Sequence, residues 1–112
     1  MEDSILKSVK KSLGISPDDK SFDEDVLMHI NSTFSVLQQL GIGPPEGFQI
    51  EDKTSDWTEF LGTDKRLNMV KTYVHQKVRL VFDPPATGYL VEAAKAQILE
   101  TEVRLVNLVP IV

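Results

Sequence analysis

Hydrophobic side chains recur at steps of three and four residues along most of the chain, which is the spacing of helices that bury one face. This spacing predicts a first helix over 4–13, capped by Asp3 or Ser4. Gly14 follows it, and glycine favours the backbone conformation in which helices stop. Lysine side chains are predicted on the solvent face of this helix: Lys7, Lys10 and Lys11.

Three long helices are expected after this first one. The earliest covers about 23–40 and is ended by Gly41. The next covers about 64–82 and stops before a Pro-Pro pair, because proline disfavours helix in the residue that precedes it. The last starts after Thr87 and is ended by Pro110. A short DPPATG turn joins the last two, so they are predicted to form an antiparallel hairpin.

The middle of the chain, about 41–53, is predicted to be an extended loop, because its glycines and prolines forbid a continuous helix. Its Gly-Phe-Gln-Ile stretch suits a short extended segment. A short helix is expected over 54–61, with Thr54 or Ser55 as cap. The single tryptophan, Trp57, lies on its apolar side. The favoured interpretation packs this ring on the bundle, and the alternative makes it an exposed binding anchor.

These elements predict an all-α fold, a small bundle of about four to five helices with a long C-terminal helical hairpin and an extended central loop. The whole chain, 1–112, is expected to form a single domain, since its length and its content of 41% hydrophobic and 26% charged residues are typical of one globular unit. No apolar run suits a bilayer span and no secretory signal opens the chain, so we expect no membrane partner. The absence of cysteine excludes disulfides and thiolate chemistry.

The sequence holds no constellation that indicates catalysis. The two histidines, His29 and His75, lack carboxylates at metal-binding spacing, so both are interpreted as partly exposed residues of helix surfaces. The serines lack the glycine context of a nucleophile elbow, and the prolines of the central loop remove amide donors that a phosphate cradle needs. We therefore expect no enzyme activity, no cofactor and no metal.

The net charge of −5 argues against a nucleic-acid grip, but its distribution is informative. Residues 23–63 carry eight acids against Lys53 alone, whereas the bases gather on the helix predicted over 64–82. Opposite charges on two parts of one surface suit a head-to-tail contact between copies, which closes into a ring when the rotation permits. The candidate subunit-interface residues are Glu46, Glu51, Asp52, Asp56, Glu59, Lys65, Arg66, Lys71, Lys77 and Arg79.

The C-terminal segment, 106–112, is apolar and follows the last charged residue, Arg104. Free chain ends are usually polar, so this segment either folds back onto the core or docks into a partner. The candidate docking residues are Leu105, Leu108, Val109, Ile111 and Val112.

The order of the segments resembles the small tailed-bacteriophage head–tail connector family, the adaptors of the virion neck. The resemblance extends over about 1–105 and rests on ILKSVKKSLGI, on DEDVLMHINSTFSVLQQLGIGPPEGFQI, on the short WTEFLG, and on the hairpin RLNMVKTYVHQKVRLVFDPPATGYLVEAAKAQILETEVRL. The combination of LGIGP, WTEFLG and the DPP hairpin is more specific than any one of these pieces.

This resemblance implies a structural virion protein made in the host bacterial cytoplasm and placed at the head–tail interface. Such adaptors form a ring, usually a dodecamer, beneath the portal protein. The ring extends the DNA channel, which DNA passes without specific binding, and it presents a docking surface to the next neck (stopper) or tail-completion protein. Glu46, Glu51 and Asp52 are then expected to line the channel, and the apolar C-terminal residues to engage the portal. The alternative is a small, non-enzymatic helical interaction or regulatory module that stays a monomer or dimer.

Overall fold

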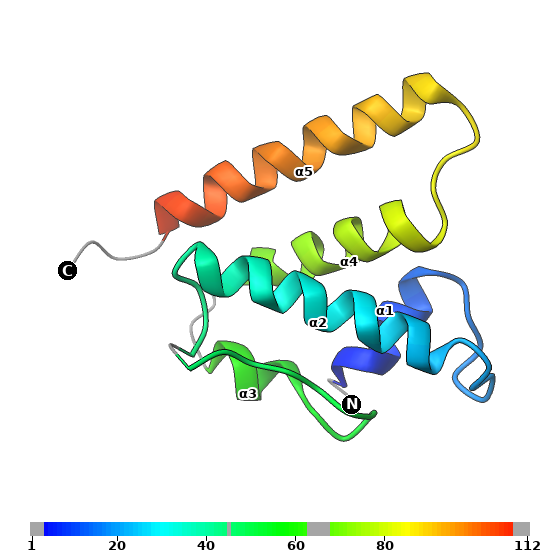
Figure 1. Ribbon diagram of the computed structural model, residues 1–112, viewed down its shortest axis with the longest axis vertical. Coiled ribbons are helices and arrows are strands. Elements are labelled where there is room, and N and C mark those ends of the chain that lie inside the picture. Colours follow the sequence, from blue (N-terminus) through cyan, green and yellow to red (C-terminus); the bar gives the residue numbers. More distant parts are fainter. Residues whose placement is uncertain (1–3, 45, 63–67, 109–112) are drawn as a thin grey trace.

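Five helices make up most of the computed structural model, which describes residues 4–44, 46–62 and 68–108 (Figure 1). In chain order they are α1 (Ile5–Ser12), α2 (Asp23–Gln39), α3 (Trp57–Leu61), α4 (Met69–Phe82) and α5 (Gly88–Leu108). Within the described ranges the chain is all-α, as predicted, and the Gly-Phe-Gln-Ile stretch runs as irregular backbone rather than as a strand.

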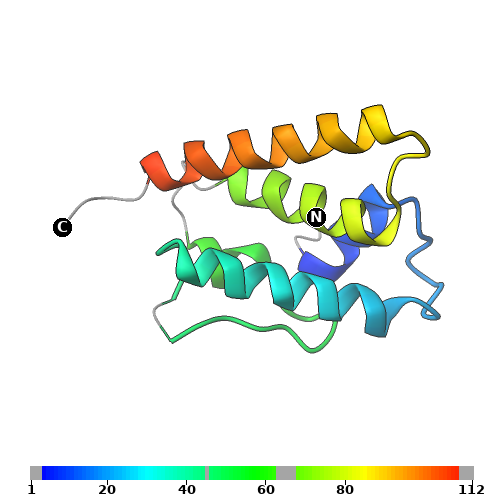
Figure 2. The ribbon, with the colours of Figure 1, turned by 45° about the horizontal axis from the view of Figure 1, so that its top comes forward.

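Helix α4 is central to the arrangement, because it contacts α1, α2 and α5. Figure 2 shows α5 as an outer layer above α4, with α2 on the other side of α4 and α3 beside the central loop. Helices α4 and α5 run in opposite directions, which confirms the predicted antiparallel hairpin (Figure 1). Helix α5 is therefore the least enclosed of the long helices.

The core lies between α1, α2, α3 and α4. Its largest fully buried side chains are Trp57, Tyr73, Phe34, Ile5, Ile30, Leu37, Leu105, Val9, Val26, Val70, Val74 and Val78. Helix α5 adds to the buried apolar set only Ile98 and Leu105 among the described residues. Burying such side chains stabilises a fold by roughly 1.5–3 kcal/mol each, so most of the stabilisation comes from the first four helices.

Helices α1 and α2 end in the same way, at the glycines that the sequence analysis named as stops. Gly14 has φ +77° and Gly41 has φ +83°, the left-handed conformation that glycine adopts without strain. The N–H of Ile42, after Gly41, donates to the carbonyl of Leu37 at 2.9 Å, and Ile42 is buried. This pattern is a Schellman motif, in which the residue after the glycine also packs against the helix.

The cap of α3 differs from the expectation of Thr54 or Ser55. The N-cap is Asp56, which forms a capping box with Glu59, whose Oε2 accepts from the Asp56 N–H at 3.0 Å. A capping box needs a glutamate three residues after the cap, and Asp56 is the residue that has Glu59 at that spacing. The helix consequently begins at Trp57.

Trp57 packs on the bundle, as the favoured interpretation held. The side chain is only 1% exposed, and its indole Nε1 donates to Ser8 Oγ of α1 at 2.8 Å. The ring also lies edge-on to Phe34 of α2, with centroids 6.4 Å apart. These contacts tie α3 to α1 and α2, and they exclude Trp57 as an exposed anchor in this conformation.

The prediction that Lys10 lies on the solvent face is wrong. Its side chain is buried, and its Nζ lies 2.7 Å from Asp23 Oδ1 at the start of α2. The same ammonium donates to the carbonyl of Asp19 at 2.8 Å, because the connection between α1 and α2 folds over it. A buried charge is tolerated when a counter-ion and hydrogen-bond acceptors surround it. Lys10 therefore joins three segments that the helical spacing alone leaves unconnected.

Helix α4 begins at Met69, with Asn68 as N-cap, and the part of its predicted span before residue 68 lies outside the described residues. It ends at Phe82, where the N–H of Asp83 still donates to the carbonyl of Arg79 at 2.8 Å. Helix α5 then runs to Leu108, so the expectation that Pro110 ends it also falls outside the described residues. The Pro-Pro pair separates the two helices as predicted.

Candidate assembly surfaces

The central loop is fixed to the helices by polar contacts at several points. The carboxamide of Asn31 on α2 donates to the carbonyl of Ile50 at 2.9 Å and accepts from its N–H at 2.8 Å. Ser4 Oγ donates to the carbonyl of Lys53 at 2.8 Å. The N–H of Ile5 donates to the carbonyl of Ser55 at 3.0 Å. The loop therefore has a defined course within a single copy of the chain.

Aromatic packing fixes the other half of the loop. Phe48 lies edge-on to Phe34 and to Phe60, with ring centroids 5.2 and 5.1 Å apart. Gly43 passes so close to the Phe60 ring that an added Cβ would lie 2.6 Å from two ring carbons. Gly43 also has φ +92°, so both its space and its backbone require glycine. The loop is held by a ring cluster and one obligatory glycine.

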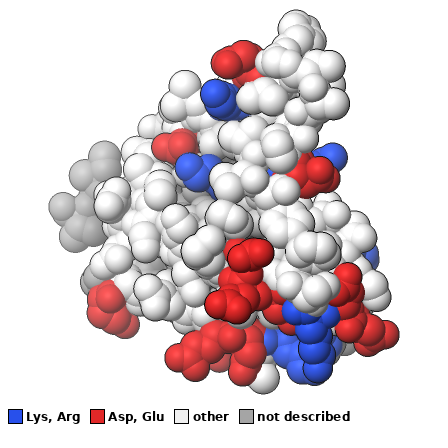
Figure 3. Space-filling view, turned by 45° about the vertical axis from the view of Figure 1, so that its right-hand side comes forward, with Lys and Arg blue, Asp and Glu red and all other residues white. Residues whose placement is uncertain are grey.

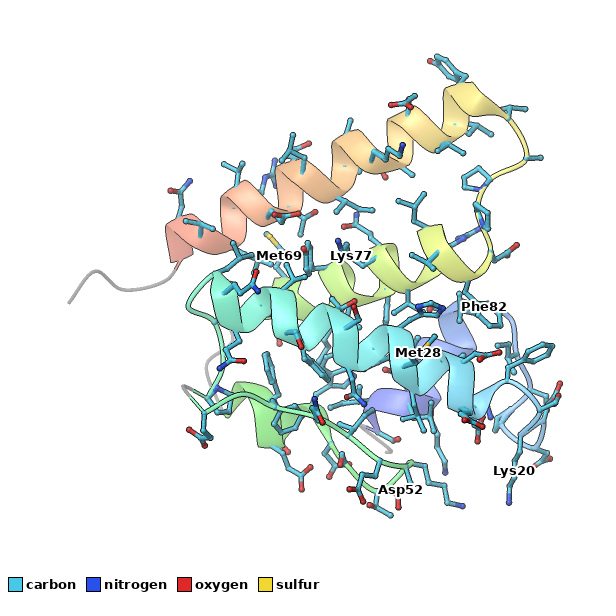
Figure 4. The ribbon with its side chains drawn as sticks, viewed as in Figure 1. Lys20, Met28, Asp52, Met69, Lys77 and Phe82 are labelled. Carbon is cyan, nitrogen blue, oxygen red and sulfur yellow. The ribbon has the colours of Figure 1, made fainter. Side chains whose placement is uncertain are left out.

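The acidic candidates of the loop all lie on the surface. Glu46, Glu51 and Asp52 are exposed, and Figure 4 shows Asp52 at the edge of the molecule, away from Lys77. The hydroxyl and the N–H of Thr54 both donate to Asp52 Oδ1, and these hydrogen bonds lower the pKa of the Asp52 carboxyl. The structure thus shows three exposed carboxylates along one loop that is held in place.

The other two acidic candidates, Asp56 and Glu59, are exposed as well. Both carboxylates belong to the capping box of α3. Their local role is to begin that helix.

The basic candidates do not form one face of α4. Lys71 Nζ lies 6.0 Å from the centre of the Trp57 ring, on the side of α4 that meets α3. Lys77 Nζ lies 6.0 Å from the centre of the Tyr73 ring, and its side chain also borders a small hollow between α2 and α4. Arg79 is exposed beside α5. The remaining two candidates, Lys65 and Arg66, lie outside the described residues.

The candidate docking residues at the C-terminal end also differ in their positions. Leu105 is fully buried against the bundle, so it supports α5 from inside instead of offering an exposed contact. Leu108 is the last residue of α5. Val109, Ile111 and Val112 lie outside the described residues.

Helix α5 has two apolar faces, and only one of them is covered. The inner face, at alternating steps of three and four, packs on α4 and consists of Val91, Ala94, Ile98, Thr101 and Leu105. Thr101 Oγ1 donates across this contact to Gln76 Oε1 of α4 at 3.1 Å. The outer face carries large apolar side chains that are exposed: Leu99 (62%), Val103 (55%) and Val106 (46%). Exposed apolar patches of this kind mark protein–protein contacts.

Leu99 and Val103 of this outer face were not named in the sequence analysis, whereas Val106 belongs to the apolar segment 106–112 that it did name. Its signal is present in the sequence, since α5 carries apolar residues at helical spacing on two neighbouring sides, with Leu99 and Val106 each directly after an inner-face residue. A helix that is apolar on both sides is usually enclosed by neighbours. In Figure 3 acidic and basic side chains gather most densely at the lower end, and in the upper part they are scattered among uncharged residues.

A groove of about 670 Å³ opens between α4 and α5, near the turn that joins them. Its apolar lining is Pro84, Pro85, Ala86, Leu90, Ala93, Ala94 and Ile98, and its polar lining is Gln76, Arg79, Asp83 and Gln97. The two helices are thus in close contact near Thr101 and Leu105 but separated toward the turn. The groove has the size and the lining of a site that accepts an apolar group.

Both histidines are half-buried, and His29 lines the same small hollow as Lys77. The His75 ring is edge-on to Trp57, with centroids 6.2 Å apart. Burial, reinforced by the positive charge of Lys71, lowers the pKa of His75 below its ordinary value of 6.5. Within the described ranges no group of three or more histidine, aspartate or glutamate side chains is placed to hold a metal ion. No helix in those ranges is both long and apolar enough to cross a membrane.

The geometry defines a class of protein: a small all-α domain with a fixed acidic loop, an exposed apolar helix face and a groove beside it. The chain belongs to the family described as phage connector protein, whose sequence model matches residues 5–108. This is a family of phage structural proteins, which confirms the family resemblance. Comparison with curated proteins and with solved structures found no match.

Proposed function

We propose that this protein is a head–tail connector of a tailed phage, without catalytic activity, which forms a ring beneath the portal protein and extends the DNA channel. The match to the connector family over residues 5–108 is the observation that carries this proposal. The exposed outer face of α5 supports it, because a helix face of this kind needs a partner to be buried. The further partners are the next neck (stopper) or tail-completion protein and other copies of the chain, all at the neck of the virion.

The acidic loop suits the channel of such a ring. Packaged DNA must pass a connector without being held, and exposed carboxylates repel phosphate. Glu46, Glu51 and Asp52 are exposed on a loop that intramolecular contacts hold in place, so a ring of copies would present a regular set of negative charges. In this proposal DNA passes the loop without specific binding.

The C-terminal segment is proposed to engage the portal. The residues after Arg104 carry no charge, and Leu105 anchors this end of α5 in the core. Removing residues 106–112 is then expected to abolish binding to purified portal while leaving the helical bundle folded. Retained portal binding by the shortened protein would assign docking to another surface.

The acidic segment 46–59 is also proposed to meet the basic side chains of a neighbour's α4. Reversal of Lys71 and Lys77 to glutamate is expected to weaken ring formation, and reversal of acids in the partner segment is expected to restore it. Unchanged rings by light scattering in the Lys71→Glu and Lys77→Glu variants would contradict this pairing.

The alternative function is a small interaction or regulatory module that binds one partner and stays a monomer or dimer. Sedimentation of the protein mixed with purified portal separates the two functions. A connector adds many copies to each portal assembly, and an interaction module adds none. Wild-type protein that leaves the mass of the portal unchanged at saturating concentration would contradict the connector function.

A further inference from the structure

We propose that the outer face of α5 on one copy (Leu99, Val103 and Val106) docks into the groove between α4 and α5 of the next copy. The inference rests on the proposed ring and names the surface that builds it. Both parts of the contact are apolar and open to solvent in the single chain: the outer face is about half exposed, and the groove measures about 670 Å³.

The outer face and the groove lie on opposite sides of the same helix. Leu90 and Gln97 line the groove, whereas Leu99 and Val106 belong to the outer face. Leu99 follows Leu90 by nine residues, and Val106 follows Gln97 by nine residues. Nine residues correspond to about two and a half turns at 3.6 residues per turn, which places the members of a pair on opposite sides. When one copy docks its outer face into the groove of a second copy, the second copy still has a free outer face. The contact is therefore head-to-tail and repeats from copy to copy instead of ending at a dimer.

The sizes of the side chains on the two surfaces are complementary. Small side chains, Ala93 and Ala94, line the groove on α5, and the Pro-Pro pair of the turn lines it as well. Branched side chains, Leu99 and Val103, project from the outer face of the neighbouring copy. Large residues entering a row of small ones are the usual arrangement where helices pack closely.

Charges at the edges favour the same pairing. Arg79 borders the groove and is exposed, and no acidic side chain within the described ranges pairs with it. Glu92 lies on the outer face seven residues before Leu99, and its contact with Lys95 is exposed and long, at 3.7 Å. A docked copy therefore offers Glu92 as a partner for the Arg79 guanidinium. This places Arg79, one of the interface residues expected from the sequence, at the contact between copies.

Face-to-face pairing of two outer faces is the alternative occupant. It leaves the groove uncovered and brings two Glu92 side chains to the same contact, and it ends at a dimer. Docking into the groove covers both apolar surfaces and provides Arg79 with an acidic partner. The observations therefore favour a second copy seated in the groove.

Cross-linking tests the contact, because the chain has no cysteine of its own. Gln97→Cys places a thiol in the groove and Val106→Cys places one on the outer face. The protein carrying both is concentrated, with and without portal, and treated with a bifunctional thiol reagent shorter than the ~13 Å helical rise between the two positions. The proposal predicts a ladder of covalent multimers on a denaturing gel. Each single-cysteine protein is predicted to stay monomeric.

The outcomes separate this inference from the proposed function. Rings on the portal without a ladder would leave the connector function standing and overturn this contact. A ladder without any portal complex would support the contact and contradict the connector function. A covalent dimer from the Val106→Cys protein alone would show face-to-face pairing and overturn the proposal, and the absence of both ladder and rings would overturn both.

A second variant tests the apolar part of the contact. The double substitution Leu99→Glu with Val103→Glu is expected to reduce the amount of cross-linked multimer at least tenfold. The helical content by circular dichroism is expected to stay unchanged, because both side chains are exposed. Met28→Glu, at an apolar side chain of α2 that is 59% exposed, is the matched control and is expected to keep the ladder. Equal loss in both proteins would contradict the assignment to α5.

Discussion

Asn31 on α2 pairs with the backbone of Ile50 through both ends of its carboxamide: Nδ2 donates to the carbonyl at 2.9 Å, and Oδ1 accepts from the N–H at 2.8 Å. The two bonds satisfy the backbone of a buried loop residue, as a neighbouring strand does in a sheet. Because Glu51 and Asp52 follow directly, this pair determines where the loop carries its negative charge.

Substitution of Asn31 by alanine is expected to lower the free energy of unfolding by about 2 kcal/mol, because it leaves a buried N–H and carbonyl of Ile50 without partners. Urea unfolding measures the loss. Gln39→Ala, at an exposed position of the same helix, is the control and should change stability by less than about 0.5 kcal/mol. Equal effects of the two substitutions would show that the loop does not depend on Asn31.

Gly43 and Gly41 provide a matched pair, since both have positive φ but differ in the space around them. Gly41→Ala is expected to cost about 1 kcal/mol, because an added Cβ meets only open space and the loss is backbone strain. Gly43→Ala adds a clash with the Phe60 ring and is expected to cost at least about 2 kcal/mol. Thermal unfolding of both variants measures the difference, and a Gly43→Ala protein as stable as Gly41→Ala would contradict the close approach.

Burial lowers the pKa of His75 in the folded protein, so the unfolded chain takes up a proton at a higher pH than the folded one. The stabilisation from the neutral ring is fully present above the unfolded value of 6.5, and it is lost as the pH falls from there through the lower folded pKa. The urea midpoint is therefore expected to decrease between pH 7 and pH 5. His75→Gln should reduce this slope, and a slope unchanged by His75→Gln would assign the pH dependence to other groups.

Local signals account for what the sequence could predict of this fold. Gly14 and Gly41 end their helices through backbone conformations that few other residues adopt, and the Pro-Pro pair separates α4 from α5. The burial of Lys10 was missed because it depends on the α1–α2 connection folding over the helix. The outer face of α5 was missed for a related reason: helical spacing shows which sides are apolar, but not how many neighbours cover them.

The site was predictable to a similar extent. The acids of the central loop are all exposed, as expected for polar side chains of a surface loop. The bases of α4 were treated as one set, yet Lys71, Lys77 and Arg79 project to different sides, since their spacing of six and two residues does not match the helical repeat. Counting charges by segment therefore predicted the exposed acids of the loop, but it did not predict which sides of α4 carry the bases.

Charge reversal of the loop tests its proposed place at the channel. The triple substitution Glu46→Lys, Glu51→Lys and Asp52→Lys is expected to slow genome release from assembled particles, because lysines bind the phosphates that must pass. Release is followed by the fluorescence of a DNA dye. The control carries the same change in charge at exposed acids elsewhere, Asp18→Lys, Glu24→Lys and Asp25→Lys, and should release DNA at the wild-type rate. Normal release from the loop variant would exclude these residues from the channel.

Electron microscopy of purified portal incubated with this protein tests the connector function most directly. The function predicts an added, coaxial ring of density on one face of each portal particle, at saturating protein and without any other phage component. Portal particles that remain unchanged, while the protein stays folded and at most dimeric, would contradict it.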